Sequence, residues 1–449
     1  MEIKGTYTTA IVHTENIEQE AVNQINDIVN CRAFDRQTVH FMPDVHASLN
    51  STVGFTTTLG DYINPQHIGG DIGCTVSMLL LDKSVAEDKY AEFEHRLRKE
   101  IPMGSDINEH SVVDEREFMN FLSKEFNKAR QQWPECLSEL PIKVTEKWIN
   151  EQLKRVNMET GLFYKSCGSL GSGNHMIEYD ETVDKQHCAV IVHCGSRNFG
   201  QKVAKYWTMI ASGKLQKNKD EKERIKQLRV QFKEDWKKTH WKDKTGYDEA
   251  LAKFIEEQTA DSSRIDGYLS GDDMNGYLCD VCFAQCYARY NHMIIHETIQ
   301  EILQKYGISV EEEIYCTHNY ISMRDHILRK GAISAYRDEK IIVPFNMRDG
   351  VAVCRGKSNS NWNFSCSHGS GRRMSRAQAK KRISVEEFTE SMRGIYSTSV
   401  GRGTLDESPQ AYKDTEEIKT LISETCEILY MMPAKINLKA MTSDGSNDD

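Results

Sequence analysis

Residues that commonly bind metals recur beside glycines or at the ends of predicted strands, and this pattern constrains the fold more than any other. They are one carboxylate, one thiol and four imidazoles: Asp71, Cys74, His175, His193, His318 and His368. A lone histidine in such a place is usually structural. A set of six, each placed where a rigid scaffold presents side chains to a cleft, supplies the mixed ligands that bind borderline divalent metals such as Zn, Mn or Fe.

The glycine-rich segments alternate irregularly with helical ones. Residues 42–74 place short apolar runs between glycines and prolines, which predicts strands and tight loops, and residues 330–370 form a second such region. Apolar residues at helical spacing predict amphipathic helices over 84–160, a long helix over 276–306 and terminal helices up to Pro433. The irregular order predicts an α+β fold, with central β-structure flanked by helices, rather than regular βαβ alternation.

A single domain is expected over residues 1–440, followed by a polar tail at 441–449. Residues 214–260 are rich in Lys, Glu, Asp and Trp, which predicts a charged helical insertion within that domain. The chain starts without a basic segment and apolar run, and no stretch approaches the roughly 18 apolar residues of a membrane span. We therefore expect a cytoplasmic protein that does not interact with membranes.

The thirteen cysteines fit a reducing compartment, because no signal peptide accompanies them. Cys279, Cys282 and Cys286 share one helix face but lack a second pair to complete a zinc site, so they are expected to be small buried residues.

The net charge of −10 argues against a protein that coats nucleic acid, which requires a broad basic surface. Any RNA contact must be local. The candidate cluster consists of Arg372, Arg373, Arg376, Lys380, Lys381 and Arg382, although such a run is more often a solvated helix face.

Three short motifs suggest chemistry. In Gly70-Asp71-Ile72-Gly73-Cys74 the carboxylate and thiol can turn toward one point, and a thiolate can bridge two metal ions; the alternative is a buried cysteine and a loop cap. Gly171-Ser172-Gly173-Asn174-His175 could cradle a phosphate but lacks a P-loop lysine. In Ser367-His368-Gly369-Ser370-Gly371-Arg372-Arg373, the histidine suits a nucleophile toward phosphorus; the alternative is a tight turn before a helix from Ser375.

Together and in order, the motifs resemble those of the RtcB RNA-splicing ligases. The resemblance spans residues 42–413. It rests on Met42-Pro43-Asp44-Val45-His46, Asp71-Ile72-Gly73-Cys74, Gly171-Ser172-Gly173-Asn174-His175, His193-Cys194-Gly195-Ser196-Arg197, His318-Asn319, Arg329-Lys330-Gly331-Ala332, His368-Gly369-Ser370-Gly371-Arg372, Asp406-Glu407-Ser408-Pro409 and Ala411-Tyr412-Lys413.

The resemblance implies two Mn²⁺ ions bridged by Cys74, and a nucleophile that attacks GTP. Asp71 and His175 would complete one metal site, and His193 and His318 the other. His368 would attack the α-phosphate of GTP to form a histidine–GMP phosphoramidate. GMP would then pass to an RNA 3′-phosphate, itself formed from a 2′,3′-cyclic phosphate, and a 5′-hydroxyl would displace it.

The resemblance also implies residues that contact the nucleotide and the RNA. Arg197 would meet a phosphate of the RNA end, and Asp44 and His46 would line the same cleft. The expected nucleotide-binding residues are Asn174, Glu178, Asn346, Gly369, Ser370, Gly371, Tyr412 and Lys439.

The chain departs from the family pattern at Thr75, at residues 345–348, at Ser370 and after Lys439. In the family, side chains of the loop at 345–348 help to hold the nucleotide, and this chain has Phe345-Asn346-Met347-Arg348 there. Two alternatives therefore stay open: an enzyme that stops at 3′-end guanylylation or cyclic-phosphate hydrolysis, and a non-catalytic, metal-bound RNA sensor. Family members often use an archease activator, and the RNA could serve tRNA splicing or RNA repair.

Overall fold

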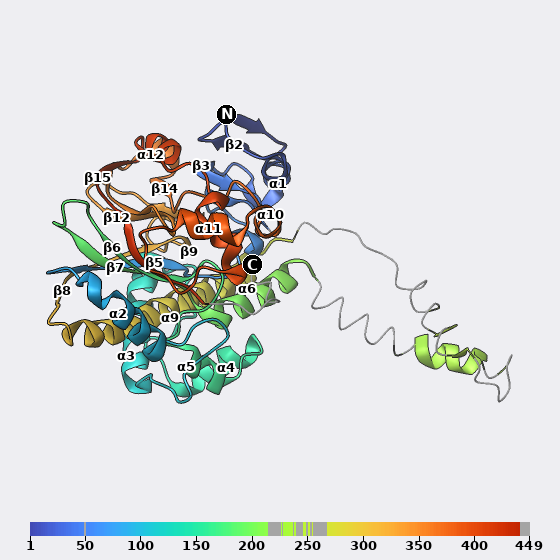
Figure 1. The fold of residues 1–449 in the computed structure, drawn as a ribbon. Coiled ribbons are helices and arrows are strands. Elements are labelled where there is room, and N and C mark those ends of the chain that lie inside the picture. Colours follow the sequence, from blue (N-terminus) through green and yellow to red (C-terminus); the bar gives the residue numbers. More distant parts are fainter. Residues whose placement is uncertain are drawn as a thin grey trace.

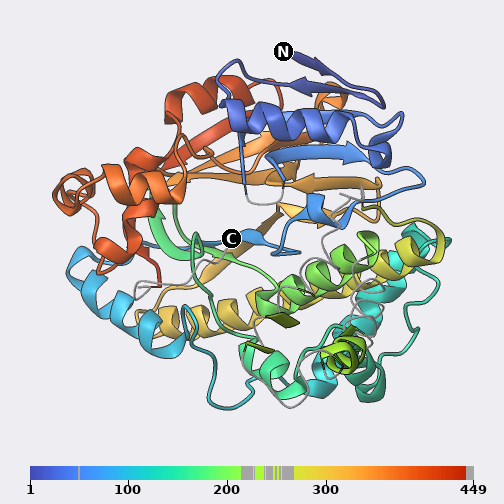
Figure 2. The same ribbon diagram turned by 90° about the vertical axis from the view of Figure 1, so that its right-hand side faces the viewer.

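The computed structural model of this chain describes residues 1–48, 51–213 and 267–440, together with 226, 228–236, 238, 246, 247, 250, 251 and 254. The β-sheets lie above a layer of helices in the view of Figure 1 and in the turned view of Figure 2, and some further helices lie beside the sheets in the upper part. This arrangement confirms the predicted α+β class.

A six-stranded sheet contains the N-terminal strands, in the order β1-β2-β3-β4-β10-β9. Its neighbours are antiparallel except for β2 and β3, which are parallel. The strands are β1 (Glu2–Lys4), β2 (Thr9–Val12), β3 (Val39–His46), β4 (Val53–Thr58), β9 (Asn319–Ile321) and β10 (Ile327–Lys330).

A five-stranded antiparallel sheet has the order β16-β6-β7-β5-β8. Its alternating side chains enter two different hydrophobic cores, as expected for a sheet covered on both faces. The strands are β5 (Thr75–Leu81), β6 (Met176–Glu181), β7 (Cys188–Cys194), β8 (Val310–Thr317) and β16 (Ala434–Leu438).

Two smaller sheets complete the β-structure of the described residues. The order β12-β13-β15 forms a three-stranded sheet, and β11 pairs with β14. Side chains of both sheets share one core with the five-stranded sheet. The strands are β11 (Ala332–Ser334), β12 (Lys340–Asn346), β13 (Gly350–Gly356), β14 (Ser365–Ser367) and β15 (Cys426–Met432).

The longest helix, α9 (Gly271–Gln304), crosses beneath the sheets and contributes to the core on their helical side. The predicted helix over 276–306 is thus confirmed. The other helices are α1 (Gln19–Val29), α2 (Tyr90–Glu100), α3 (Glu115–Gln132), α4 (Glu146–Arg155), α5 (Thr160–Ser166), α6 (Arg197–Ala211), α10 (Arg376–Arg382), α11 (Val385–Ser391) and α12 (Thr415–Ile422).

The amphipathic helices predicted over 84–160 are confirmed by α2, α3 and α4. Side-chain caps start two of them: Asp114 accepts hydrogen bonds from the backbone N–H groups of Arg116 and Glu117, and Thr145 accepts one from Trp148. Cys279 and Cys282 are buried on α9, as predicted, whereas Cys286 is only partly buried.

The prediction of terminal helices up to Pro433 is wrong beyond α12. The segment after α12 forms β15 and β16, separated by Pro433. β15 pairs with β13, and β16 pairs with β6. Partners distant in sequence decide the conformation of this segment, and local periodicity does not reveal them.

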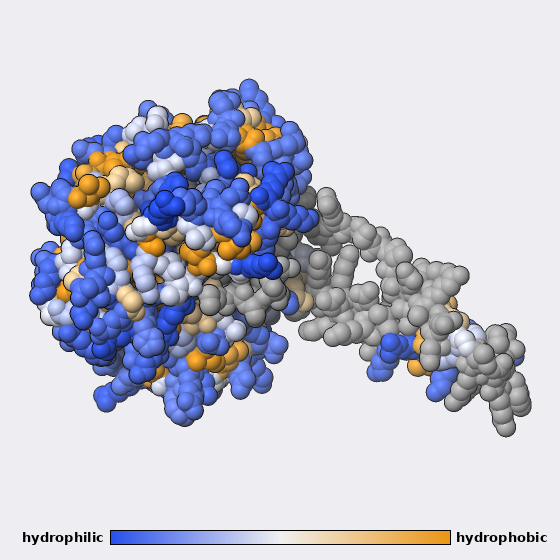
Figure 3. All heavy atoms as spheres, in the orientation of Figure 1, coloured by the Kyte–Doolittle hydropathy of each residue, from blue (hydrophilic) through white to orange (hydrophobic). Residues whose placement is uncertain are grey.

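Most of the predicted insertion and the whole predicted tail lie outside the described residues. Within the insertion, residues 228–236 are helical. No described helix is long and apolar enough to cross a membrane. Figure 3 shows a largely hydrophilic face with small scattered hydrophobic areas.

An aromatic cluster joins three of the helices. The Phe283 ring on α9 lies 4.8 Å from that of Phe199 on α6 and 5.9 Å from that of Phe163 on α5, measured between ring centroids. All three side chains are fully buried.

We expect Phe283→Ala to lower the free energy of unfolding by about 3–5 kcal/mol, because it leaves a cavity. Denaturant unfolding measures this change, and Val183→Ala, at an exposed position, is the matched control. A loss below about 1 kcal/mol would contradict the prediction.

Candidate active site

Strand register gathers the predicted metal ligands at one end of the five-stranded sheet. Thr75 on β5 pairs with Cys194 on β7 and with Thr317 on β8. Met176 on β6 pairs with His193. Residues 74, 175, 193 and 318 each adjoin or belong to these pairs, so one edge holds side chains that are far apart in sequence.

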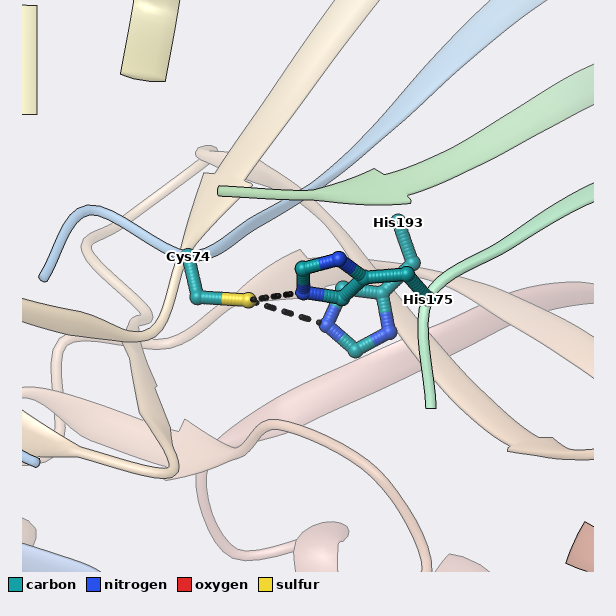
Figure 4. A group of neighbouring side chains, drawn as sticks. All are labelled: Cys74, His175 and His193. Carbon is teal, nitrogen blue, oxygen red and sulfur yellow. Dashed lines mark hydrogen bonds between the residues drawn. The ribbon is translucent and has the colours of Figure 1, made fainter. Parts of the chain in front are cut away.

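The Cys74 thiol lies at the centre of this group. Its Sγ atom is 3.2 Å from Nε2 of His193 and 3.6 Å from Nε2 of His175 (Figure 4). All three residues are buried, and their ligand atoms lie within 4.8 Å of one another.

Two further ligands extend the group at its ends. Nε2 of His175 is 3.0 Å from Oδ2 of Asp71, and Nε2 of His193 is 3.3 Å from Nε2 of His318. The ligand atoms therefore form a row, from Asp71 through His175, Cys74 and His193 to His318.

The spacing and chemistry of this row fit divalent metal ions. Two ligand atoms bound to one ion at about 2.1 Å are about 3.0–3.4 Å apart in octahedral or tetrahedral geometry. Three distances in the row, from 3.0 to 3.3 Å, lie in this range, and the 3.6 Å between Cys74 Sγ and His175 Nε2 lies just above it, as expected because metal–sulfur bonds are longer, about 2.3 Å. Hydrogen bonds cannot explain every contact, because neutral imidazoles have only one N–H donor each. The Nδ1 atom of His175 is used elsewhere, 2.9 Å from the Leu170 carbonyl oxygen, which leaves Nε2 to face the row.

Burial sets the protonation of these groups. It lowers the pKa values of His193 and His318 well below the usual range of imidazole. It raises the pKa of the Cys74 thiol, and the Asp71 carboxylate adds to this effect. For Asp71 burial acts to raise the pKa, but its contacts with His175, Cys74 and the backbone of Ser196 bring it below the usual value. The lowered pKa values keep His193 and His318 neutral, and the lowered pKa of Asp71 keeps it ionised, which are the metal-binding forms of these groups. The Cys74 thiol would bind a metal by losing its proton to solvent.

Close packing explains the glycine that precedes the thiol. Gly73 has a φ of +81°, and a Cβ atom there would lie 2.9 Å from Cβ of Ala288 on α9. A side chain at position 73 would push the loop away from the long helix and displace Cys74.

The predicted nucleophile lies beside the ligand row. The ring centroid of His368 is 4.9 Å from that of His318. Its Nδ1 atom is 2.7 Å from Oδ2 of Asp44, whose carboxylate is fully buried. Because a carboxylate only accepts hydrogen bonds, Nδ1 carries the proton and donates a hydrogen bond to Asp44. The lone pair of a neutral His368 is consequently on Nε2.

The loop after His368 can approach this closely only with glycine. Gly371 has a φ of +70°, and a Cβ atom there would lie 2.2 Å from the carbonyl oxygen of Asp44. The Ser370 hydroxyl donates to the Phe345 carbonyl oxygen at 2.6 Å. The nucleophile loop is thus held against both β3 and the end of β12.

A buried carboxylate anchors two predicted nucleotide-binding residues. Glu407 accepts hydrogen bonds from the Tyr412 hydroxyl at 2.8 Å and from Nζ of Lys439 at 3.0 Å. Burial acts to raise the pKa of Glu407, but the positive charges of Lys439, Arg376 and Arg372 hold it far below the usual value. Glu407 is therefore a permanent anion that orders residues from two separate segments.

The other residues predicted to contact the nucleotide or the RNA lie around Glu407 and the ligand row. Lys439 also donates to the backbone oxygen of Asn174 at 3.1 Å. Arg197 donates to the Ser169 hydroxyl and the Gly104 carbonyl, beside the loop that carries His175. Glu178 is buried on β6.

Asn346 ends β12, where its side-chain amide donates to Asp349 at 2.8 Å. Asn346, Asp349 and Tyr412 line a cavity of about 600 Å³. His46 donates a hydrogen bond from Nδ1 to the backbone oxygen of Asp44 at 2.8 Å, which helps to hold the strand that carries the partner of His368.

The predicted basic cluster is only partly available to RNA. Arg372 and Arg376 pair with Glu407, Arg376 also pairs with Asp406, and Lys380 lies 3.8 Å from Asp406. Two carboxylates, Asp406 and Glu407, thus pair with three of the six residues of the predicted cluster. They lie next to the cluster in space although they are distant from it in sequence.

Sequence reasoning gave no role to Asp44 as the partner of His368 or to Glu407 as the anchor of Tyr412 and Lys439. Ser196 was also missed: its backbone N–H donates to Oδ1 of Asp71 at 3.1 Å. All three residues belong to motifs that the sequence does display, so their positions could be found from the sequence, but their partners could not.

Known proteins resemble the chain over nearly its whole length. A family model described as tRNA-splicing ligase RtcB matches residues 24–439. The RNA-splicing ligase RtcB of Escherichia coli K12 is 27% identical over 420 residues, which cover 89% of each chain. RNA-splicing ligase RtcB homolog 1 of Entamoeba histolytica is 24% identical, over 86% of this chain and 76% of the relative. The tRNA-splicing ligase RtcB of Pyrobaculum aerophilum is 23% identical, over 84% and 82%.

The central position of the thiol generates a direct prediction. Cys74→Ala should weaken the binding of divalent metal ions by more than about tenfold, because even the loss of outer partners of a metal site costs that much. Metal content after equilibrium dialysis measures the change. Cys188→Ala removes an equally buried thiol at the other end of β7 and should bind as the wild type does. Equal metal content in all three proteins would refute the site.

Proposed function

Because the chain belongs to the RtcB family of tRNA-splicing ligases, we propose that it joins RNA ends that carry a 3′-phosphate or a 2′,3′-cyclic phosphate to 5′-hydroxyl ends, using GTP and two Mn²⁺ ions. The single observation that carries this proposal is the placement of His368. Its Nδ1–H is held by a buried carboxylate, and its ring lies against the end of a five-residue ligand row.

The first step is attack by Nε2 of His368 on the α-phosphorus of GTP. The N–P bond forms from the Nε2 lone pair while the bond from phosphorus to the departing pyrophosphate oxygen breaks. The Nδ1–H of His368 stays hydrogen-bonded to Asp44, and this carboxylate stabilises the positive charge that develops on the ring. Asp44 is therefore a positioning residue for the nucleophile.

The ligand row would hold the metals, with Asp71 and His175 on one side, His193 and His318 on the other, and Cys74 between them. Bound Mn²⁺ supplies charge neutralisation for the phosphate groups. Glu178, Asn174, Tyr412 and Lys439 would hold the nucleotide, together with Asn346 and the backbone of Gly369, Ser370 and Gly371.

The later steps use the activated phosphate. An RNA 3′-phosphate oxygen attacks the GMP phosphorus and His368 departs, which regenerates the free imidazole. The 5′-hydroxyl of the second RNA then attacks the RNA phosphate and GMP departs. Arg197, held beside the His175 loop, would bind a phosphate of the RNA end.

The proposal extends to the cellular setting. Residues 1–440 would act as one catalytic domain, in the cytoplasm, on RNA ends from tRNA splicing or from RNA damage. An archease-like activator would assist the guanylylation step.

The nucleophile can be tested by covalent labelling. With Mn²⁺ and GTP radiolabelled at the α-phosphate, the wild type should retain acid-labile label after denaturation, and His368→Ala should retain none. His187→Ala is the matched control, because His187 stacks on Tyr430 away from the ligand row. Label that persists in His368→Ala would refute the assignment.

The role of Asp44 generates a separate prediction. In Asp44→Asn the amide can donate to Nδ1, which favours the tautomer that has its proton on Nε2. We expect the rate of guanylylation to fall by about 10²–10⁴-fold, while Mn²⁺ content stays unchanged. Single-turnover labelling measures the rate, and an unchanged rate would show that Asp44 does not set the tautomer.

A further inference from the structure

Two carboxyl groups are buried together in the interior of the sheet packing. Glu178 and Asp180 alternate on β6, so they share the face that carries Met176. Met176 belongs to the core between the five-stranded and three-stranded sheets, whereas Ile177 and Tyr179 belong to the opposite core. Glu178 is 1% exposed and Asp180 is 0% exposed.

These carboxyl groups receive little support from their surroundings. The side-chain amide of Asn437, the β16 partner of Glu178 in the sheet register, donates to Oε2 of Glu178. Across the part of the chain that the structure describes, no other side chain donates to Oε1 of Glu178 or to either oxygen of Asp180. Because they stand two residues apart on one face of β6, the two carboxyl groups are neighbours, and hydrogen bonding between them acts to lower the pKa of Glu178 and to raise that of Asp180.

The nearby charges do not neutralise the pair. Lys439 faces Glu178, but its Nζ already binds Glu407 and the backbone of Asn174. Asp349, on the turn between β12 and β13, adds a further negative charge, while β13 offers Asp180 only its backbone at Val351. Two adjacent carboxylates in such a place cannot both ionise, so they hold a proton between them.

We propose that Asp180 carries this proton and donates a hydrogen bond to Glu178. Asp180 thereby keeps Glu178 ionised and sets the preference of the site for guanine. This inference rests on the proposed function, in which Glu178 contacts the nucleotide. Asp180 itself touches no nucleotide; it acts through Glu178 as a positioning and specificity-determining residue.

The hydrogen-bonding edges of the two purines explain the link to specificity. Guanine presents two adjacent donors, N1–H and the N2 amino group, which match an ionised carboxylate with two acceptor oxygens. Adenine presents one donor at N6 and one acceptor at N1, which match a protonated carboxylic acid. The location of the shared proton therefore decides which base the same side chain favours.

The electrostatics agree with a proton on Asp180. Burial raises the pKa of Asp180 well above the usual value, and the Glu178 charge raises it further. Burial also raises the pKa of Glu178, but hydrogen bonds from Asn437 and Asp180 limit the rise to about 7. As pH falls through this value Glu178 gains a proton of its own, so the preference for guanine should weaken. Without the Asp180 donor, that loss should occur at a higher pH.

The base preference can be measured as the ratio of covalent labelling with GTP to labelling with ATP, at several values between about pH 5.5 and pH 8.5. In the wild type this ratio should fall by about tenfold per unit below neutrality. Asp180→Asn retains an N–H donor and should follow the wild type. Asp180→Ala removes the donor, and the midpoint of its profile should move upward by about one unit or more. An identical profile for Asp180→Ala and the wild type would overturn the proposal.

A second measurement needs no nucleotide. Infrared spectra of the apoprotein at about pH 7.5 should show the carbonyl stretch of a buried protonated carboxyl group, which Asp180→Asn should remove. Asp280→Asn is the matched control, because Asp280 is equally buried but pairs with Arg155, and its pKa is about 6. A wild type that lacks the band, or an Asp180→Asn variant that keeps it, overturns the shared proton. A wild type that has the band but takes no label from either nucleotide overturns the proposed function and the base preference.

Discussion

The candidate site depends on one constraint, the register of β5 between β7 and β8. That register sets Cys74 beside His193 and His318, and β6 adds His175 from the outer side of β7. A shift of one residue would turn the ligands to the opposite face of the sheet. Side chains on the two faces of the sheet pack into two different cores, so a shifted strand would have to repack both of them. Folding the sheet and assembling the ligand row are therefore a single event.

Buried charged groups around the ligand row are a second feature on which the site depends. Asp44, Glu407 and the Glu178–Asp180 pair lie around the ligand row, and each has a different compensation: an imidazole donor, three cations and a tyrosine, or a shared proton. A buried anion that lost its compensation would cost several kcal/mol. These groups thus hold distant segments in one arrangement, with the C-terminal strand β16 bound to the loop that carries Asn174.

The sequence predicted the candidate ligands and the α+β fold class from local signals. A glycine beside a ligand-type residue marks a tight loop, and irregular alternation of strands and helices marks an α+β fold. The pairing of strands and of side chains that are distant in sequence could not be predicted. Nothing local in Cys426–Met432 predicts its pairing with β13, and nothing in the motif around Asp44 names His368 as its partner. Arg372 and Arg376 likewise look free in a sequence and are paired in space.

The most direct test of the central claim is anomalous diffraction at the manganese edge, from crystals grown with Mn²⁺ and GTP. We expect two peaks in the ligand row, both beside the Cys74 thiol, and continuous density from Nε2 of His368 to a GMP phosphorus. Peaks elsewhere, or no peak in contact with Cys74 and an unmodified His368, would contradict it.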